Sequence, residues 1–291
     1  MLFLLKKQRK EEERMKRFSL VLFVLLFGVT LFACQVEDQF NLEVETEIVV
    51  GLEAAYAPFN WATPEENEFT VALDGQSGFY ADGYDVVMAQ EIADALGLTL
   101  VIKAYSWDGL IPALNAGEID LIIAGMSPTA ERALTVNFSE EYYRSEQVMV
   151  VRNDGDYANA TSLIDFNGAR VVAQAGTLQD DLINQITGVV HQETLNSYGD
   201  LVNALAYGTS DAFVAELPVA TGIVQTNNQF TIIEFAEGLG FEVSDEDIIV
   251  SVALRLEDLD LLDAVNEALS NISNLSRQQI MQDALSRQPQ E

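Results

Sequence analysis

Short apolar runs alternate with amphipathic segments along the chain from Glu47 onward. The runs are rich in valine and isoleucine, which is typical of strands buried on both faces of a parallel sheet. The amphipathic segments repeat their apolar residues at helical spacing, as with Met88, Ile92 and Leu96, and Gly97 then marks a helix end. This alternation predicts an α/β fold made of βαβ units.

The apolar runs and the helically spaced segments also give the bounds of the expected strands and helices. Strands are predicted at 48–52, 99–102, 119–124, 148–151, 169–173, 211–215, 230–233 and 248–254, and helices at 85–96, 108–116, 178–186, 199–207, 259–272 and 277–285. The series of strands and helices occurs twice, over two units of about 100 residues each. The last strand and the last two helices are too few for a third sheet, so we expect them to return to the first unit.

Two lobes are therefore predicted, each a mostly parallel sheet flanked by helices. The first lobe comprises residues 46–145 together with 245–291, and the second comprises residues 146–244. The chain then crosses between the lobes twice, near 144–147 and near 241–244. A pair of such crossings would act as a hinge.

The N-terminal part has the layout of a secretory signal. An apolar run at 18–33 follows Lys16 and Arg17 and stops at Cys34, the only cysteine of the chain. At about 16 residues the run is shorter than the roughly 20 that span a bilayer as a helix. Residues 1–33 are therefore predicted to be a cleaved signal peptide.

The end of this run resembles the lipobox of bacterial lipoproteins, in which a peptidase cuts before a cysteine that then carries diacylglycerol. Leu31, Ala33 and Cys34 match, whereas Phe32 stands where a small or branched residue is usual. The resemblance implies lipid at Cys34, followed by an acidic tether over 34–46. A small buried cysteine is the other interpretation, and a lone cysteine excludes an intramolecular disulfide.

Residues 1–14 carry a charged cluster of their own, ahead of a complete signal peptide that begins at Met15. Two interpretations follow from this arrangement. Either translation starts at Met15, or the signal peptide simply has a long charged leader.

Acidic residues outnumber basic ones by 46 to 15, which gives a formal net charge of −31. Seven basic and three acidic residues precede Cys34, so the mature chain would have eight basic and 43 acidic residues and a net charge of about −35. This balance argues against charge-driven binding of nucleic acid or of an anionic membrane surface.

His191 is the only histidine, which leaves no hydrolase triad and little support for a metal site. We expect a binding protein, not an enzyme, without cofactor or metal.

Four motifs stand in order along the chain: YAPFNW at 56–61, GYDVVMAQEIADALG at 83–97, WDGLIPALNAGEIDLIIAGMSPTAER at 107–132 and FSEEYY at 138–143. Together they resemble the amino-acid-binding proteins of bacterial ABC importers, known as solute-binding protein family 3, over residues 47–285. Val87 stands where this family usually has an acidic residue.

The resemblance implies a two-lobe, periplasmic-binding-protein-like fold of type II. It also implies that the protein captures a free polar amino acid by closing its lobes and hands it to the transmembrane subunits of an ABC importer. The protein would be a monomer on the extracytoplasmic face of the cell membrane, anchored through lipid at Cys34. An arogenate-dehydratase-like enzyme on the same fold is the alternative function.

A free amino acid presents one carboxylate and one ammonium, and each must recover the hydrogen bonds that it loses with water. Arg132 supplies a planar fork that suits a bidentate bond to the carboxylate. Backbone N–H groups of Thr177, Leu178 and Gln179, at a helix start after Gly176, would complete this subsite from the second lobe. A surface arginine in a helix that begins after Ser127 is the other interpretation of Arg132.

The ammonium needs acceptors. The family places a carboxylate five residues after the aspartate of a GxxD strand start, and here Gly208 and Asp211 lead to Glu216, a glutamate at the usual aspartate position. The Gly125 carbonyl and the Ser127 hydroxyl are expected to assist from the first lobe. Glu216 is also explained as a carboxylate that is stabilised at a helix N-terminus.

Recognition of the ligand's side chain is assigned by the resemblance to Glu53, Tyr56 and Trp107. Aromatic walls accept many shapes and favour cationic heads by roughly 0.5 to 2 kcal/mol. Ordinary core packing is the other interpretation of the two aromatic residues. Glu53 could pair with a guanidinium or an ammonium, or accept from a neutral amide, so arginine and lysine are expected first and glutamine next.

Overall fold

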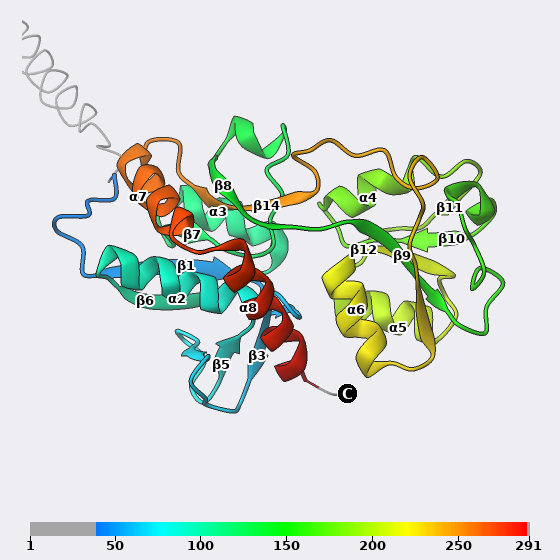
Figure 1. Ribbon diagram of the computed structural model, residues 1–291, viewed down its shortest axis with the longest axis horizontal. Helices are drawn as coiled ribbons and strands as arrows, with labels where there is room; N and C mark the ends of the chain where they lie inside the picture. Colours follow the sequence, from blue (N-terminus) through cyan, green and yellow to red (C-terminus); the bar gives the residue numbers. More distant parts are fainter. Residues whose placement is uncertain (1–38, 290–291) are drawn as a thin grey trace, which may run out of the picture. The chain divides into compact units, whose positions relative to one another are not determined.

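The computed structural model describes residues 39–289, so the predicted signal peptide and Cys34 lie outside the described residues (Figure 1). From Phe40 onward the chain forms one unit by its internal contacts. Phe40, inside the predicted tether, is buried, and its N–H donates to a carboxylate oxygen of Asp258 at 2.9 Å. The last part of that tether is therefore attached to the folded unit.

The elements are numbered as in Figure 1. The strands are β1 (Glu47–Leu52), β2 (Ala55–Tyr56), β3 (Asn60–Thr63), β4 (Val71–Ala72), β5 (Tyr80–Asp82), β6 (Thr99–Ala104), β7 (Leu121–Ile122), β8 (Asn137–Arg144), β9 (Gln147–Arg152), β10 (Arg170–Val172), β11 (Val190–His191), β12 (Ala212–Glu216), β13 (Phe230–Ile233) and β14 (Ile249–Leu254). The helices are α2 (Tyr84–Leu96), α3 (Leu110–Asn115), α4 (Leu178–Ile183), α5 (Tyr198–Ala206), α6 (Leu217–Thr226), α7 (Leu259–Ser270) and α8 (Asn274–Arg287), with 3-10 turns η1 (Trp107–Gly109), η2 (Arg132–Leu134) and η3 (Leu163–Phe166).

The two five-stranded sheets have the same topology. The first has the strand order β6-β1-β7-β14-β8, and the second has the order β11-β10-β12-β9-β13. In each sheet the first two pairings are parallel and the last two antiparallel, so four strands point one way and only β14 or β9 runs against them. Both exceptions are strands by which the chain enters from the other sheet. The predicted α/β fold with two mostly parallel sheets is confirmed, and each sheet with its helices is called a lobe below.

The chain passes between the lobes at two adjacent places, first between β8 and β9 and again before β14. The two crossings touch, because the Ser145 N–H donates to the Ile248 carbonyl at 2.8 Å. Next to the predicted return crossing at 241–244, the side-chain amide of Gln185, in the second lobe, bonds both backbone polar groups of Glu242 at 2.8 Å.

Helix α2 shows how the predicted amphipathic pattern becomes packing. Val86 and Ile92 are fully buried, and the helix packs against α7 and α8. It starts after Gly83, whose φ is 133°, and a Cβ there would lie 2.2 Å from the Phe59 carbonyl oxygen. Glycine thus allows the start of β3, at Asn60, to lie against the first turn of α2.

Some elements differ from the predicted ones. The helix expected at 108–116 consists of the turn η1 and the short α3, with Pro112 placed in the first turn of α3, where its missing N–H costs no hydrogen bond. The sheet β2-β3-β5-β4 is not predicted, because strands of two to four residues are too short to show a period. Helix α6 is not predicted either, since it follows β12 directly, without a turn residue between them.

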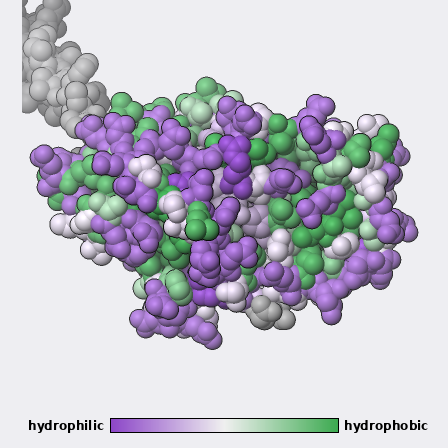
Figure 2. Space-filling model, viewed as in Figure 1, coloured by the Kyte–Doolittle hydropathy of each residue, from purple (hydrophilic) through white to green (hydrophobic). Residues whose placement is uncertain are grey.

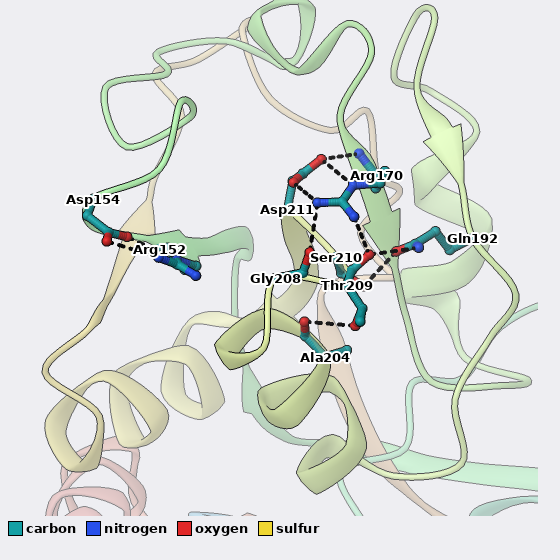
Figure 3. A network of polar contacts seen from close by, with 9 residues as sticks. All are labelled: Arg152, Asp154, Arg170, Gln192, Ala204, Gly208, Thr209, Ser210 and Asp211. Carbon is teal, nitrogen blue, oxygen red and sulfur yellow. Dashed lines mark hydrogen bonds and ion pairs between the residues drawn. The ribbon is translucent and has the colours of Figure 1, made fainter.

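The turn that leads into β12 is fixed by Arg170 (Figure 3). Its guanidinium donates to the carboxylate of Asp211 at 2.6 Å and 3.1 Å and to the carbonyls of Gly208 and Thr209 at 2.9 Å each. Strand β10, which carries Arg170, is thereby joined to this turn as well as to β12. Glu216 is the last residue of β12, at the other end of the strand.

Buried apolar side chains form two clusters. One extends from the first lobe into the second at Val148 and Val150, and the smaller one lies around Phe166 and Val171. Hydrophilic residues cover most of the face seen in Figure 2, with smaller hydrophobic patches between them. Within residues 39–289, no helix has the length and apolar character needed to cross a membrane.

Candidate ligand-binding site

A small cavity of about 20 Å³ lies where the two lobes meet. It is lined by Glu53, Tyr56, Trp107, Gly125, Ser127 and Arg132 from the first lobe and by Gln174, Thr177, Leu178, Gln179, Tyr198 and Glu216 from the second. The structure thus brings together all ten residues that the sequence nominates as ligand contacts.

Several lining residues follow the ends of parallel strands. Glu53 follows β1, Gly125 comes shortly after β7, Gln174 comes shortly after β10, and Glu216 is the last residue of β12. In open α/β sheets, ligands bind outside the carboxyl ends of the strands. The equivalent edges of two sheets with the same topology therefore face one cavity.

Arg132 is the one basic side chain among the lining residues. Its guanidinium donates to the Ser127 carbonyl at 2.8 Å and to the Gly176 carbonyl at 3.2 Å, and it lies 5.1 Å from the ring centre of Trp107. Within residues 39–289 it belongs to no salt bridge. Burial lowers the pKa of Arg132, and the charge of Glu216 opposes this shift. A cation held by neutral oxygens in a cleft is suited to an anionic partner.

The Gly176 carbonyl connects the lobes, because the Trp107 indole N–H donates to it at 3.0 Å alongside Arg132. Helix α4 begins directly after this glycine, with Thr177 as its N-cap and the Thr177 hydroxyl donating to the Gln174 carbonyl at 2.8 Å. The N–H groups in the first turn of a helix have no partner inside the helix. Those of α4 therefore offer hydrogen-bond donors to the cavity next to Arg132.

Glu216 is buried and accepts a hydrogen bond from the hydroxyl of Tyr56 and another from the side chain of Gln179. Burial raises the pKa of Glu216, while these hydrogen bonds and the charge of Arg132 oppose the rise. The ring of Tyr198 lies 4.8 Å from that of Tyr56. Arg132, Glu216, Tyr56 and Gln179 are called the Arg132 cluster below.

Glu53 accepts a hydrogen bond from the side-chain amide of Gln174 at 2.8 Å, and the two residues are called the Glu53 pair below. Burial raises the pKa of Glu53 to about 7; the bond from Gln174 opposes this rise, and the negative charge of Asp108 adds to it. In the part of the chain that the structure describes, Glu53 is in no salt bridge. Its charge therefore depends on what lies beside it in the cavity.

Gly125 and Ser127 follow β7 and contribute to the cavity wall beside the Arg132 cluster and the Glu53 pair. Gly125 has a φ of 63°, and a Cβ there would lie 2.8 Å from a ring carbon of Tyr56, so glycine is required for the ring to lie where it does. Its N–H donates to the hydroxyl of Tyr142 at 2.9 Å. The Ser127 hydroxyl donates to the Asp247 carbonyl at 3.5 Å, which is at the limit of a hydrogen bond.

The sequence does not nominate two of the lining residues, Gln174 and Tyr198. A signal exists for Gln174, because a polar residue comes shortly after a buried strand, at the same kind of strand end as Glu53. Tyr198 carries no such signal, since an aromatic residue at the start of an amphipathic helix resembles an ordinary core residue.

His191 lies outside the cavity. Its Nε2 is 2.7 Å from a carboxylate oxygen of Asp180, and its Nδ1 is 3.3 Å from the amide oxygen of Asn184. Across residues 39–289, no group of three or more histidine, cysteine, aspartate or glutamate side chains is arranged to hold a metal ion.

Comparison with known proteins identifies the family to which this cavity belongs. The model of the bacterial extracellular solute-binding proteins, family 3, matches residues 48–284. The chain belongs to this family. The resemblance drawn from the four motifs is thereby confirmed, and an extracellular solute-binding protein works outside the cytoplasm.

Curated relatives and a solved structure extend the comparison. The chain is 26% identical over 265 residues to the arginine-binding extracellular protein ArtP of Bacillus subtilis, covering 89% of this chain and 94% of the relative. It is 31% identical over 218 residues to a probable histidine-binding protein of Campylobacter jejuni, covering 73% and 78%. An amino acid ABC transporter substrate-binding protein from Streptococcus pneumoniae, bound to L-arginine, superposes with a TM-score of 0.72 and 28% identity, covering 83% of this chain and 94% of that one.

These relatives agree on the class of protein. The type II periplasmic-binding-protein-like fold is confirmed, and the family and its structural neighbours are solute-binding transport proteins, not enzymes. Nothing among them favours the arogenate-dehydratase-like alternative.

Proposed function

We propose that this family 3 protein binds a free polar amino acid between its lobes and delivers it to the transmembrane subunits of an ABC importer. Arginine and lysine are the preferred ligands, with glutamine next. The observation that carries the proposal is that one cavity combines three charged groups: the Arg132 guanidinium, which has no salt bridge within residues 39–289, the buried carboxyl group of Glu216 and the half-buried carboxyl group of Glu53. An amino acid with a cationic side chain has the complementary three charges.

The ligand's α-carboxylate pairs with Arg132 and with the backbone N–H groups of Thr177, Leu178 and Gln179. These groups come from both lobes, so that a bound carboxylate joins them. The α-ammonium is held by Glu216, with the Gly125 carbonyl and the Ser127 hydroxyl as further acceptors. These seven groups of the cavity wall leave the Glu53 pair for the ligand's side chain.

The ligand's side chain extends between Tyr56 and Trp107 toward Glu53. Aromatic faces stabilise a cationic head, and a carboxylate beside it adds a charge-assisted hydrogen bond. The names of the relatives support this order of ligands, because the Bacillus subtilis relative is an arginine-binding protein and the Streptococcus pneumoniae structure contains L-arginine.

Titration calorimetry of the purified protein with each common amino acid tests this function. Arginine or lysine should bind most tightly, glutamine should follow, and aspartate and glutamate should bind most weakly because Glu53 repels their side chains. Native mass spectrometry of protein purified without refolding should detect the amino acid that the protein retains. A folded protein that binds no amino acid would contradict the proposal.

We also propose that the mature protein begins at acylated Cys34, with translation starting at Met15. The complete signal peptide at 15–33 supports this assignment. Intact-mass analysis and labelled-palmitate incorporation should find a lipid on Cys34. A secreted form without lipid, or a mature N-terminus elsewhere, would contradict it.

Motion of the lobes completes the proposal. Residues 46–145 with 245–291 would move as one body and residues 146–244 as the other, about the paired crossings at Ser145 and Ile248. A ligand that contacts both lobes favours the arrangement in which they touch. Small-angle scattering should show a smaller radius of gyration with a confirmed ligand than without it, for a protein that remains monomeric.

A further inference from the structure

Asp85 is a buried carboxylate for which the proposed ligand contacts give no role. It lies in the first turn of α2 with its side chain shielded from solvent. Its Oδ2 accepts a hydrogen bond from the Asn60 amide at 2.8 Å, and its Oδ1 accepts one from the Tyr142 hydroxyl at 2.7 Å. Among residues 39–289 it forms no salt bridge. A buried carboxyl group that has only neutral partners is costly to keep.

The first of these partners leads to the backbone beside Glu53. While the Asn60 nitrogen donates to Asp85, the Asn60 amide oxygen accepts from the Ala54 N–H at 2.7 Å. Ala54 has a φ of 56°, the only positive φ among the non-glycine residues that the structure describes. Such a conformation is unfavourable for alanine and persists only where its surroundings impose it. The Asn60 bond therefore holds the chain in the conformation that presents Glu53 to the cavity.

The second partner leads to Gly125 in the cavity wall. The Tyr142 hydroxyl donates to Asp85 and accepts from the Gly125 N–H at 2.9 Å. Gly125 contacts the ring of Tyr56, whose hydroxyl bonds to Glu216. The Tyr142 bond therefore fixes the segment on which the ring of Tyr56 rests.

The charge of Asp85 sets the direction of both chains of hydrogen bonds. An ionised carboxylate only accepts. Asn60 must consequently turn its nitrogen to Asp85 and its oxygen to Ala54, and Tyr142 must point its hydrogen to Asp85 and a lone pair to Gly125. The position of Asp85 in the first turn of a helix favours the ionised form. Burial, by contrast, raises its pKa to about 7, and the bonds from Tyr142 and Asn60 oppose that rise.

We propose that Asp85 is a positioning residue that orders two separate parts of the ligand site, the Ala54 backbone through Asn60 and the Gly125 backbone through Tyr142. This inference rests on the proposed function. The two chains of hydrogen bonds have different roles in this proposal. The Asn60 chain governs the choice among ligand side chains, because it ends next to Glu53, and the Tyr142 chain governs the contacts common to every amino acid.

Three variants test this division with L-arginine and L-glutamine as probes. Tyr142→Phe removes one hydroxyl and keeps the ring, and it should weaken both ligands about tenfold while their affinity ratio stays unchanged. Asn60→Ala should lower the arginine-to-glutamine affinity ratio about fivefold or more, because Glu53 is no longer held in place. Asp85→Asn cannot accept from both partners and should show a loss of affinity for both ligands together with a lower ratio.

Tyr84→Phe is the matched control. Tyr84 is equally buried and its hydroxyl donates to the backbone carbonyl of Tyr142 at 2.7 Å, so the variant loses a neighbouring hydrogen bond and keeps the hydrogen-bonding side chains of both chains, Asp85, Asn60 and Tyr142. It should lower the melting temperature and leave both affinities unchanged. Circular dichroism and thermal unfolding of every variant separate misfolding from altered binding, and Tyr142→Phe keeps the test open if Asp85→Asn does not fold.

The outcomes separate this inference from the proposed function. If the wild-type protein binds no amino acid, both are wrong. If the wild-type protein binds but folded Tyr142→Phe and Asn60→Ala keep its affinities and ratio, the inference alone is wrong. A uniform loss in all variants, Tyr84→Phe included, would show that Asp85 contributes stability and no positioning.

Discussion

The Arg132 cluster and the Glu53 pair face the same cavity but are held in different ways. The Arg132 cluster is fixed from both lobes, by the Ser127 and Gly176 carbonyls around the guanidinium and by the Tyr56 and Gln179 side chains around the carboxylate of Glu216. The Glu53 pair has one hydrogen bond between its members and a carboxyl pKa of about 7. Under the proposed function, the charges common to all amino acids would meet the more firmly held group, whereas the charge that distinguishes ligands would meet a carboxyl group that can gain or lose a proton.

Loss of the guanidinium should have the largest effect, because it removes the one cation of the Arg132 cluster. Arg132→Ala should weaken every amino acid by about 2 to 5 kcal/mol, or roughly 30-fold to several-thousand-fold, with the arginine-to-glutamine ratio nearly unchanged. Titration calorimetry checks this. Arg152→Ala, which removes an exposed guanidinium paired with Asp154, is the control and should bind normally. Near-native affinity of Arg132→Ala would remove Arg132 from the site.

Substitution at Glu53 should lower the affinity for cationic ligands and leave the affinity for neutral ligands almost unchanged. A charge-assisted hydrogen bond contributes roughly 1.5 to 3 kcal/mol, so Glu53→Gln should weaken arginine or lysine about tenfold or more. Glutamine should bind almost as before, since an amide can supply what a neutral ligand needs. The control is Glu118→Gln, which removes the same charge from an exposed site. An unchanged arginine-to-glutamine affinity ratio in Glu53→Gln would show that selectivity comes from other residues, such as Tyr56 or Trp107.

The raised pKa of Glu53 predicts a dependence on pH that differs between ligands. In the cleft this pKa is about 7, against an ordinary value of 4.5, so closing the cleft around a neutral ligand takes up a proton between these values. Glutamine affinity should therefore fall as the pH rises through this window, whereas a cationic ligand stabilises the ionised carboxylate and avoids the loss. The arginine-to-glutamine ratio should rise several-fold between about pH 5 and pH 8 in the wild type. A rise of equal size in Glu53→Gln would exclude Glu53 as its source.

The smallest effect is expected from a contact outside both groups. Gln288, which follows α8, donates to the Gly222 carbonyl in α6 at 3.0 Å and joins the lobes away from the cavity lining. Gln288→Ala should weaken all ligands by about two- to fivefold, because a net hydrogen bond is lost only when the lobes touch. Gln282→Ala, on the exposed side of α8, is the control. Equal affinities of the two variants would show that Gln288 does not favour closure.

The sequence predicts much of the fold because its signals are periodic. Ile48, Val50 and Leu52 alternate along β1 and are fully buried, and the apolar stripe of α2 packs where it is expected. Strands β2 to β5 escape prediction because their order comes from pairing with one another and not from a pattern within each segment.

The candidate site is predictable where a motif carries it. The carboxylate of a zwitterion explains the role expected for Arg132, and the family resemblance assigns Tyr56 to the ligand's side chain. The structure places both residues at the cavity. Tyr198 is not predictable in this way, because it reaches the cavity through its packing on Tyr56. The role of Asp85 is hidden as well, since the residue lies within a motif but its two hydrogen bonds appear only once Asn60 and Tyr142 are brought together in space.

The central claim is that one ligand must satisfy the Arg132 cluster and the Glu53 pair at the same time. Titration of the wild-type protein with L-arginine and with agmatine, which is arginine without its carboxylate, tests this most directly. Arginine should bind with high affinity and agmatine at least roughly 30-fold more weakly, because agmatine leaves Arg132 without its anionic partner. Equal binding of the two compounds, or no binding of arginine, would contradict the account.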